Sequence, residues 1–150
     1  MSGAISIRPI EAGDRAAWEP LWQGYLRFYR AHLAPEVTEF TWSRLIDPKR
    51  QPHGLVAVRD GRIIGITHFL FHPSSWTKED QCYLQDLFVD PNVRGSGAGR
   101  ALIEAVYEAA DRHGTPYVHW LTQEFNADAR ALYDTLARRT SFIQYRRMVK

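Results

Sequence analysis

Three glycines, Gly95, Gly97 and Gly99, alternate with small residues between two arginines, Arg94 and Arg100, in the stretch RGSGAGR. A loop of this kind in front of a helix points unpaired backbone N–H groups at one place, where the helix dipole adds partial positive charge. Glycine allows strained backbone angles and close approach of a ligand, and the arginines add full charges. This chemistry suits an anion, and we expect the loop to bind phosphate.

The spacing of the glycines distinguishes between phosphate-binding motifs. A Walker loop needs Gly-Lys followed by Ser or Thr, whereas Gly99 is followed by Arg100 and Ala101. A dinucleotide-binding fingerprint needs G-x-G-x-x-G, which this spacing does not match. The pattern R-x-x-G-x-G, from Arg94 to Gly99, instead resembles the pyrophosphate-binding signature of the GNAT family of N-acetyltransferases, which use acetyl-CoA.

A second motif of that family follows in the expected order. An Asn followed seven places later by a Tyr on a helix is present as Asn126 and Tyr133 in NADARALY. The sequence of the C-terminal half most resembles the branch of the family that includes fungal histone and polyamine acetyltransferases, and spermidine/spermine acetyltransferase is a more distant relative. The resemblance implies direct transfer of acetyl from acetyl-CoA, as cosubstrate, to a primary amine of a small molecule or peptide.

The resemblance also implies which residues hold acetyl-CoA. Backbone groups of Leu87, Phe88 and Val89 would contact the pantetheine arm, and the backbone of Leu87 or Phe88 would polarise the thioester carbonyl. Asn126 would contact the arm or hold its loop, or it would only cap the following helix. The pyrophosphate would lie against the segment Val93, Arg94, Gly95, Ser96, Gly97, Ala98, Gly99 and Arg100.

The reaction that the resemblance implies needs two proton transfers: one to the leaving thiolate and one from the attacking ammonium group. Tyr133 is the expected general acid for the leaving thiolate. A free alkylammonium must also lose a proton at neutral pH, and relatives of the spermidine/spermine type carry Glu where this chain has Gln85, which cannot accept it. The candidate bases are Glu124 and Asp86, although strand alternation turns Asp86 to the opposite face from Gln85.

The sequence does not identify the acceptor amine. Tyr25 and Tyr29 lie on one face of an aromatic helix, and their hydroxyl groups suit the wall of a substrate site. Polyamines, amino acids, small amines, antibiotics and lysine side chains stay open as acceptors. Two other interpretations also stay open: an acyl-CoA-binding module without catalysis, and a regulatory domain whose arginine clusters bind an acidic partner.

The pattern of residues in the N-terminal half predicts the strands and helices that precede the motifs along the chain. Apolar alternation predicts a first strand ending at Pro9, followed by a helix capped by Asp14 and a second helix over 37–46. Asp60 and Gly61 separate two apolar runs, which predicts an antiparallel hairpin.

The C-terminal half predicts the elements that carry the motifs. We expect a fourth strand over 82–90, a helix after the glycines, and a fifth strand over 117–124. A last helix begins at Asn126 or Asp128, and a last strand covers 142–149. A strand–helix–strand unit is nearly always a right-handed parallel crossover.

These elements predict an α/β fold of one domain, 1–150, with a mixed, mostly antiparallel central sheet of six or seven strands flanked by about four helices. The resemblance implies that the fourth and fifth strands splay apart. Many relatives have Gly-Phe where this chain has Ala137 and Arg138. This departure favours a helix that runs on through Arg139, a last strand exchanged with a partner chain, and a homodimer.

Composition argues against several other classes of protein. The chain has 150 residues, a formal net charge of +2 and no run of about 20 apolar residues, so we expect no nucleic-acid partner and no membrane span. The one cysteine, Cys82, cannot form an internal disulfide, and the cytoplasm is the expected compartment. His68 and His72 share a strand face without a third ligand at a suitable spacing, so we expect no metal.

Overall fold

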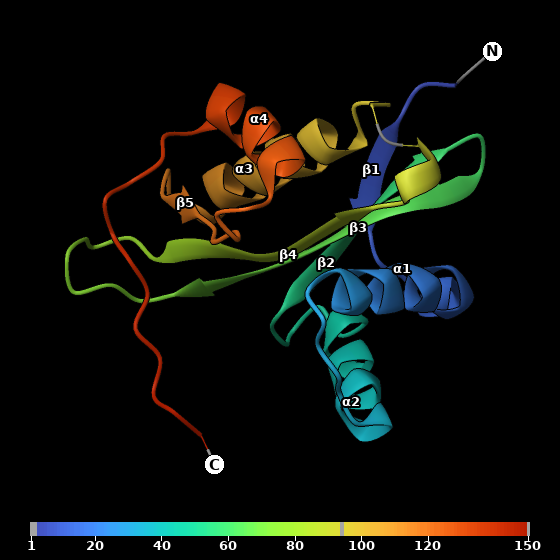
Figure 1. Cartoon of the computed structure of the whole chain (residues 1–150), viewed down its shortest axis with the longest axis horizontal. Coiled ribbons are helices and arrows are strands. Elements are labelled where there is room, and N and C mark those ends of the chain that lie inside the picture. The colour runs from blue at the N-terminus through green and yellow to red at the C-terminus, as the bar shows by residue number, and fades with distance from the viewer. Residues whose placement is uncertain (1–2, 94, 150) are drawn as a thin grey trace.

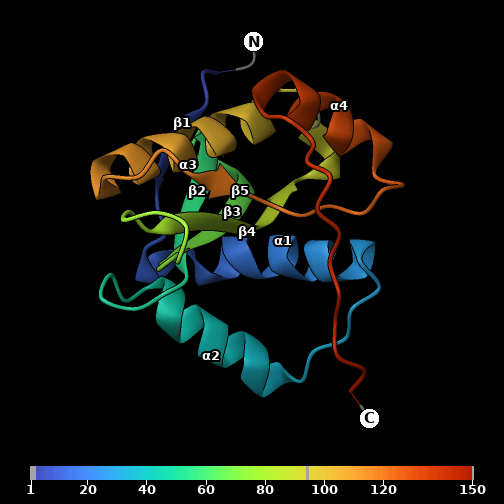
Figure 2. The same ribbon diagram turned by 90° about the vertical axis from the view of Figure 1, so that its left-hand side faces the viewer.

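The computed structural model describes residues 3–93 and 95–149, which form one sheet with helices on both faces (Figure 1 and Figure 2). The strands pair in the order β1-β2-β3-β4-β5, antiparallel except for β4 and β5, which are parallel. They are β1 (Ser6–Pro9), β2 (His53–Arg59), β3 (Arg62–His72), β4 (Gln81–Val89) and β5 (Val118–His119). The helices are α1 (Arg15–Phe28), α2 (Pro35–Leu45), α3 (Ala98–His113) and α4 (Ala127–Leu136), with short 3-10 turns η1 (Ala12–Asp14) and η2 (Pro91–Val93).

The helices lie in two layers, with α1 and α2 on one face of the sheet and α3 and α4 on the other (Figure 1). On the first face, Trp18, Trp22 and Trp42 are buried against the sheet. On the second face, Ile103 and Val106 of α3 are buried against it. Burial of this apolar surface stabilises both layers. Within the described ranges, none of the helices is both long enough and apolar enough to cross a membrane.

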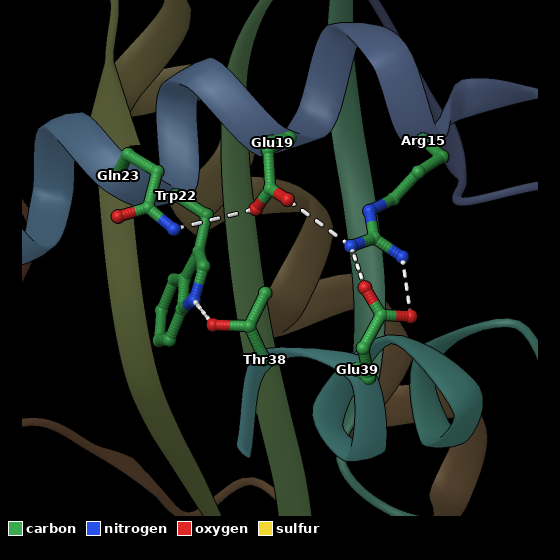
Figure 3. A network of polar contacts seen from close by, with 6 residues as sticks. All are labelled: Arg15, Glu19, Trp22, Gln23, Thr38 and Glu39. Carbon is green, nitrogen blue, oxygen red and sulfur yellow. Dashed lines mark hydrogen bonds and ion pairs between the residues drawn. The ribbon is translucent and has the colours of Figure 1, made fainter. Parts of the chain in front are cut away.

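Polar contacts attach α2 to α1 (Figure 3). The guanidinium group of Arg15 on α1 binds the carboxylates of Glu19, one turn further on, and of Glu39 on α2. Beside them, Nε1 of Trp22 donates to Oγ1 of Thr38 over 3.2 Å, in a buried position. The two helices are therefore joined by directional contacts as well as by apolar packing.

The β2–β3 hairpin is confirmed at the predicted residues. Asp60 and Gly61 both have positive φ, 52° and 75°, as a two-residue turn of the favoured kind requires. Arg59 and Arg62 pair on either side of the turn. The hairpin places the long strand β3 next to β4, which carries the candidate site residues.

A β-bulge in β4 reverses the faces to which its side chains point. Phe69 of β3 lies opposite Leu84, and His68 lies opposite Asp86, so Gln85 is the extra residue of β4. Before the bulge, Leu84 packs on the α3 face, and without a bulge Asp86 would point the same way. After the bulge, Leu87 packs on the α3 face and Phe88 on the α1 face. Asp86 therefore points to the α1 face.

Two predictions about the sheet are wrong. In the described residues the sheet has five strands, not six or seven, because 142–149 is not a strand and β5 covers only two residues of the predicted 117–124. The segment 142–149 is rich in apolar and aromatic residues, but it is exposed, has no regular secondary structure and forms no ladder with the sheet in this part of the chain. A strand needs a partner for its backbone groups, and residue type alone does not supply one.

One prediction about helix ends is also wrong. The last helix ends at Leu136 and does not reach Arg139, because Ala137 is already extended. Asp14 is the N-cap residue of α1, as predicted, but among the described residues its side chain makes no capping hydrogen bond to that helix. Its carboxylate instead binds the guanidinium group of Arg8 and the backbone N–H of Glu11. The predicted helix 37–46 is present with shifted ends, as α2, since Pro35 suits a first helical position.

Candidate active site

A cavity of about 480 Å³ lies where the last residues of β4 meet the N-terminus of α3 and one side of α4. Strand β5 pairs with β4 only at Cys82 and Tyr83, so the strands separate before this point, as the resemblance implied. In the described residues, β4 continues to Val89 without a strand on that side. The cavity is lined by Phe28, Tyr29, Leu87, Phe88, Val89, Gly95, Ser96, Gly97, Ala98, Gly99, Arg100, Asn126, Asp128, Ala129, Leu132 and Tyr133.

The glycines shape one end of the cavity. Gly95 and Gly97 have φ of 80° and 90°, and a Cβ atom built on either would meet no atom of the described residues within 4 Å. Gly99 serves a different purpose, since its Cβ would lie 3.1 Å from Cδ2 of Leu132 on α4. The first two glycines therefore allow left-handed turns that face open space, and the third lets α3 and α4 approach.

The first turn of α3 presents its backbone donors to this end. Gly97 is the N-cap of α3, and the N–H of Ala101 makes the first helical hydrogen bond, to the carbonyl oxygen of Gly97. The N–H groups of the preceding turn therefore have no acceptor within the helix. Arg100 lines the cavity and its guanidinium group donates to Oγ1 of Thr135 over 2.8 Å. Arg94 lies outside the described residues.

Tyr133 reaches the cavity from α4. Its ring packs edge-on against Trp120, with centroids 5.4 Å apart. Burial, and secondly the neighbouring Tyr29, raises the pKa of Tyr133 to about 12. The hydroxyl group is consequently protonated at neutral pH and can donate a proton to an anion formed in the cavity.

Asn126 lies at the start of α4 and also lines the cavity. Among the described residues its side chain makes no capping hydrogen bond to the helix; Nδ2 donates to Oγ1 of Thr122 instead, over 3.1 Å. The carbonyl oxygen of Asn126 accepts the first helical bond, from the N–H of Arg130. The side chain therefore ties the β5–α4 loop together beside the cavity.

Asp86 lies outside the cavity lining, on the α1 face. Its Oδ2 is 2.9 Å from Nδ1 of His68, and Nε2 of His68 accepts a hydrogen bond of 3.1 Å from Nε1 of Trp18. Tyr25 is close by: burial, followed by the charge of Asp86, raises the pKa of its hydroxyl group. The ring centroids of Tyr25 and Tyr29 are 4.9 Å apart, so Tyr25 and Tyr29 connect Asp86 with the cavity.

The structure brings most of the predicted cofactor-binding residues together and leaves some apart. Of the described residues, the predicted Val93, Tyr25, Gln85 and Glu124 are absent from the cavity lining, as is Asp86. Gln85 is exposed at the bulge. Glu124 is largely exposed too, and its carboxylate lies 3.8 Å from a guanidinium nitrogen of Arg139.

Other residues at the site were missed by sequence reasoning. Asp128, Ala129 and Leu132 line the cavity. Ala129 lies four residues before Tyr133, a helical spacing that was a signal for this residue, and Asp128 lies four residues before Leu132. From the sequence, His68 was considered only as a metal ligand and was not predicted to contact a site residue. Its contact with Asp86 depends on the bulge and on pairing between β3 and β4, for which the sequence carries no comparable signal. Among the described residues, no cluster of three His, Cys, Asp or Glu side chains could hold a metal ion.

Comparison with known proteins agrees with this geometry. The model of the family described as "Acetyltransferase (GNAT) family" matches residues 16–137. The D-amino-acid N-acetyltransferase HPA3 of Saccharomyces cerevisiae is 40% identical over 145 residues, which cover 95% of this chain and 90% of the yeast protein. This relative is fungal, in keeping with the resemblance of the C-terminal half.

Solved structures share the fold. The ribosomal-protein-alanine N-acetyltransferase of Brucella melitensis biovar Abortus 2308 superposes with a TM-score of 0.82 at 22% identity, covering 97% of this chain and 100% of that one. The aminoglycoside acetyltransferase AAC(6')-Iy, in complex with a bisubstrate analogue of CoA, gives a TM-score of 0.82 at 16% identity, with 98% and 99% covered. Because the family match spans most of the chain and a relative of nearly full length shares 40% identity, the chain belongs to the GNAT family and is an acetyltransferase.

Proposed function

We propose that this enzyme transfers the acetyl group of acetyl-CoA directly to the primary amine of a small molecule, with a free amino acid as the favoured acceptor. One observation carries the proposal: the glycine turns before α3, the backbone of Leu87–Val89 and the hydroxyl-bearing Tyr133 line a single cavity. The amino acid is favoured because the yeast relative is named a D-amino-acid N-acetyltransferase.

The residues present fit acetyl-CoA. The backbone groups of β4 beyond Tyr83 have no strand partner on the β5 side in the described residues, so they are available to a pantetheine arm. Open space lies over Gly95 and Gly97, next to the first-turn N–H groups of α3, which suits pyrophosphate. Acetyl-CoA supplies an activated thioester. The backbone N–H groups of Leu87 or Phe88 would then donate to the thioester carbonyl, where negative charge develops during attack.

Tyr133 and Asp86 take opposite roles in proton transfer. The proton that leaves the ammonium nitrogen is accepted by the Asp86 carboxylate, directly or through one water. The free amine attacks the acetyl carbonyl, a C–N bond forms and the C–S bond breaks. Tyr133, whose hydroxyl group is protonated at neutral pH, gives its proton to the departing sulfur. The acetylated nitrogen then loses its second proton, which returns the Tyr133 phenolate to the phenol, directly or through water.

The test is a panel of amines with acetyl-CoA, in which release of the free thiol is followed. The panel contains D- and L-amino acids, polyamines, aminoglycosides and a lysine peptide. We expect thiol release that depends on the amine and is fastest with an amino acid. Binding of acetyl-CoA without thiol release for any member would contradict the proposal and favour an acyl-CoA-binding module. Fastest release with a polyamine, an aminoglycoside or the peptide would contradict the assigned acceptor.

The proposed assembly is a homodimer, and the proposed compartment is the cytoplasm. The segment after α4 carries five large apolar side chains, all at least three-quarters exposed: Phe142, Ile143, Tyr145, Met148 and Val149. In both views this segment, drawn in red, leaves α4, crosses the sheet and ends on the side of α1 and α2 (Figure 1 and Figure 2). A second copy of the chain would cover apolar side chains that are otherwise in water.

A further inference from the structure

A chain of two hydrogen bonds runs from the core to the surface on the α1 face. It joins Trp18 of α1, His68 of β3 and Asp86 of β4, with donor–acceptor distances of 3.1 Å and 2.9 Å. Trp18 and His68 are fully buried, whereas the Asp86 side chain keeps 13% of its surface exposed. Asp86 is thus the end of the chain that a substrate can reach.

The indole of Trp18 determines which nitrogen of His68 carries the proton. An indole N–H can only donate, so Nε2 of His68 must be the acceptor and must carry no hydrogen. A neutral imidazole then has its hydrogen on Nδ1, which faces Oδ2 of Asp86. The donor in the second bond is therefore His68, and Oδ2 of Asp86 is the acceptor.

A buried chain of polar side chains stabilises the fold less than apolar packing would, so packing alone does not account for it. Among the described residues, Asp86 forms no ion pair with a lysine or an arginine. A mostly buried carboxylate without a cation needs hydrogen-bond donors, and apolar residues of the same volume would fill the space at lower cost. The polar chain instead ends at an accessible carboxylate next to Tyr25, which points to a role for the carboxylate.

We propose that Trp18 and His68 are positioning residues for Asp86: Trp18 holds His68 in the Nδ1–H tautomer, and His68 holds the Asp86 carboxylate in one orientation toward the acceptor amine. Because Oδ2 accepts the Nδ1–H bond, the proton of the ammonium group is received at Oδ1. This inference rests on the proposed function, in which Asp86 is the proton acceptor.

The first arm of the experiment needs no acceptor and no activity. Long-range ¹H–¹⁵N correlation spectra of the full-length protein at neutral pH report which nitrogen of each histidine carries hydrogen. We expect His68 to have a protonated Nδ1 and an unprotonated Nε2. In Trp18→Phe, which removes the indole donor and keeps an aromatic ring, the Nε2 signal should move toward the protonated position.

Trp22→Phe is the matched control. Trp22 is also a buried tryptophan of α1, but its indole donates to Thr38 and not to His68 (Figure 3). This variant should keep the parent tautomer. A parent spectrum with hydrogen on Nε2 of His68, or equal shifts in Trp18→Phe and Trp22→Phe, would overturn the inference.

The second arm measures kcat and acceptor KM with the best amine found. His68→Leu removes the donor to Asp86, and we expect kcat to fall by about 10-fold to 100-fold, as when a hydrogen-bond partner that orients a metal ligand is removed. The acceptor KM and acetyl-CoA binding should change much less. His68→Asn restores an N–H near the place of Nδ1 and should recover most of kcat.

The outcomes separate this inference from the proposed function. Equal losses of kcat in His68→Leu and His68→Asn, both folded and both binding acetyl-CoA, would show a structural role and overturn the positioning role. If the parent protein acetylates no amine, the proposed function fails. The spectra still decide the tautomer in that case, and an Nδ1–H tautomer would leave the positioning of Asp86 supported.

Discussion

At the scale of single residues, the site depends on groups whose protonation is set by their surroundings. Tyr133 lies in the cavity with a hydroxyl pKa raised to about 12 by burial, so it is a proton donor and not a base at neutral pH. An aromatic residue on a helix face is usually part of a core, and Tyr133 also packs against Trp120. Structural and catalytic roles therefore predict different effects when only the oxygen is removed.

Tyr133→Phe should lower kcat by about 100-fold or more, because a general acid contributes on that scale. Acetyl-CoA affinity and thermal stability should stay near the parent values, since the ring remains. Tyr107→Phe is the control: its hydroxyl donates to the carbonyl oxygen of Leu136, 3.0 Å away and outside the cavity lining. Steady-state kinetics measured where chemistry limits turnover check this. A Tyr133→Phe enzyme with most of the parent kcat would show that the thiolate leaves unprotonated or takes its proton from water.

Gly97→Val should remove most of the stabilisation that acetyl-CoA gives to the folded state. A valine places branched carbons over the first turn of α3, in space that is open to a phosphate. Valine at a φ of 90° also strains the backbone, so Gly114→Val, at a φ of 91° at the other end of α3, is the matched control. Melting temperatures with and without acetyl-CoA check the prediction. If Gly97→Val gains as much from acetyl-CoA as Gly114→Val does, the pyrophosphate is bound elsewhere.

At the scale of elements, the joint between β1 and α1 holds the aromatic helix against the sheet. The carboxylate of Asp14 accepts two hydrogen bonds from Arg8, at 2.8 Å and 2.9 Å, and a third from the N–H of Glu11. The hydrogen bond from Arg8 is the main reason why the pKa of Asp14 lies below its ordinary value of 3.8. The contact between Arg8 and Asp14 is therefore sensitive to acid. It also helps to hold the start of α1, the helix on which Trp18 and Tyr25 lie.

Asp14→Asn should lower the free energy of unfolding at pH 7 by about 1 to 2 kcal/mol, since bonds between charged groups are stronger than neutral ones but Arg8 is partly exposed. The pKa of Asp14 is lowered in the folded state. Its stabilisation is consequently complete above pH 3.8 and is lost as the pH falls through the folded value.

Urea unfolding at several pH values measures this difference, which should narrow below about pH 4. Glu11→Gln is the control, because the Glu11 carboxylate is 3.9 Å from Arg8 and mostly exposed, so it should lose little. A difference between parent and Asp14→Asn that does not change with pH would contradict the assignment.

At the scale of the whole molecule, the segment after α4 is the part that a single copy of the chain leaves in contact with water. Its apolar side chains are exposed, and it forms no ladder with the sheet in the described residues. The expected dimer would bury them, as an interface with an apolar centre does.

The triple variant Phe142→Ser, Ile143→Ser, Tyr145→Ser should be monomeric at concentrations where the parent is dimeric. Each change removes apolar area from the proposed interface and leaves the described core untouched. Sedimentation equilibrium measures the masses. The charge changes Arg138→Gln and Arg139→Gln, on the same segment, form the control and should leave the dimer intact. A monomeric parent would contradict the dimer.

Much of this protein was predictable from the sequence because its signals are local. The hairpin at Asp60 and Gly61 follows from the backbone angles that a short turn needs. The glycine turns before α3 and the seven-residue spacing of Asn126 and Tyr133 identify the family, and these residues line the same cavity. In each case the required backbone geometry spans only a few residues, so residue type and spacing are sufficient to predict it.

Contacts between distant segments were decided only by the tertiary structure. Strict alternation predicts that Asp86 and Gln85 point to opposite faces of β4, and a bulge interrupts this alternation. The bulge at Gln85, recorded in the pairing of β3 with β4, turns Asp86 toward α1 and toward His68. Likewise, the apolar residues of 142–149 do not make a strand without a neighbouring strand. A bulge and a strand partner both depend on hydrogen bonds to another segment, and the order of residues within one segment does not specify them.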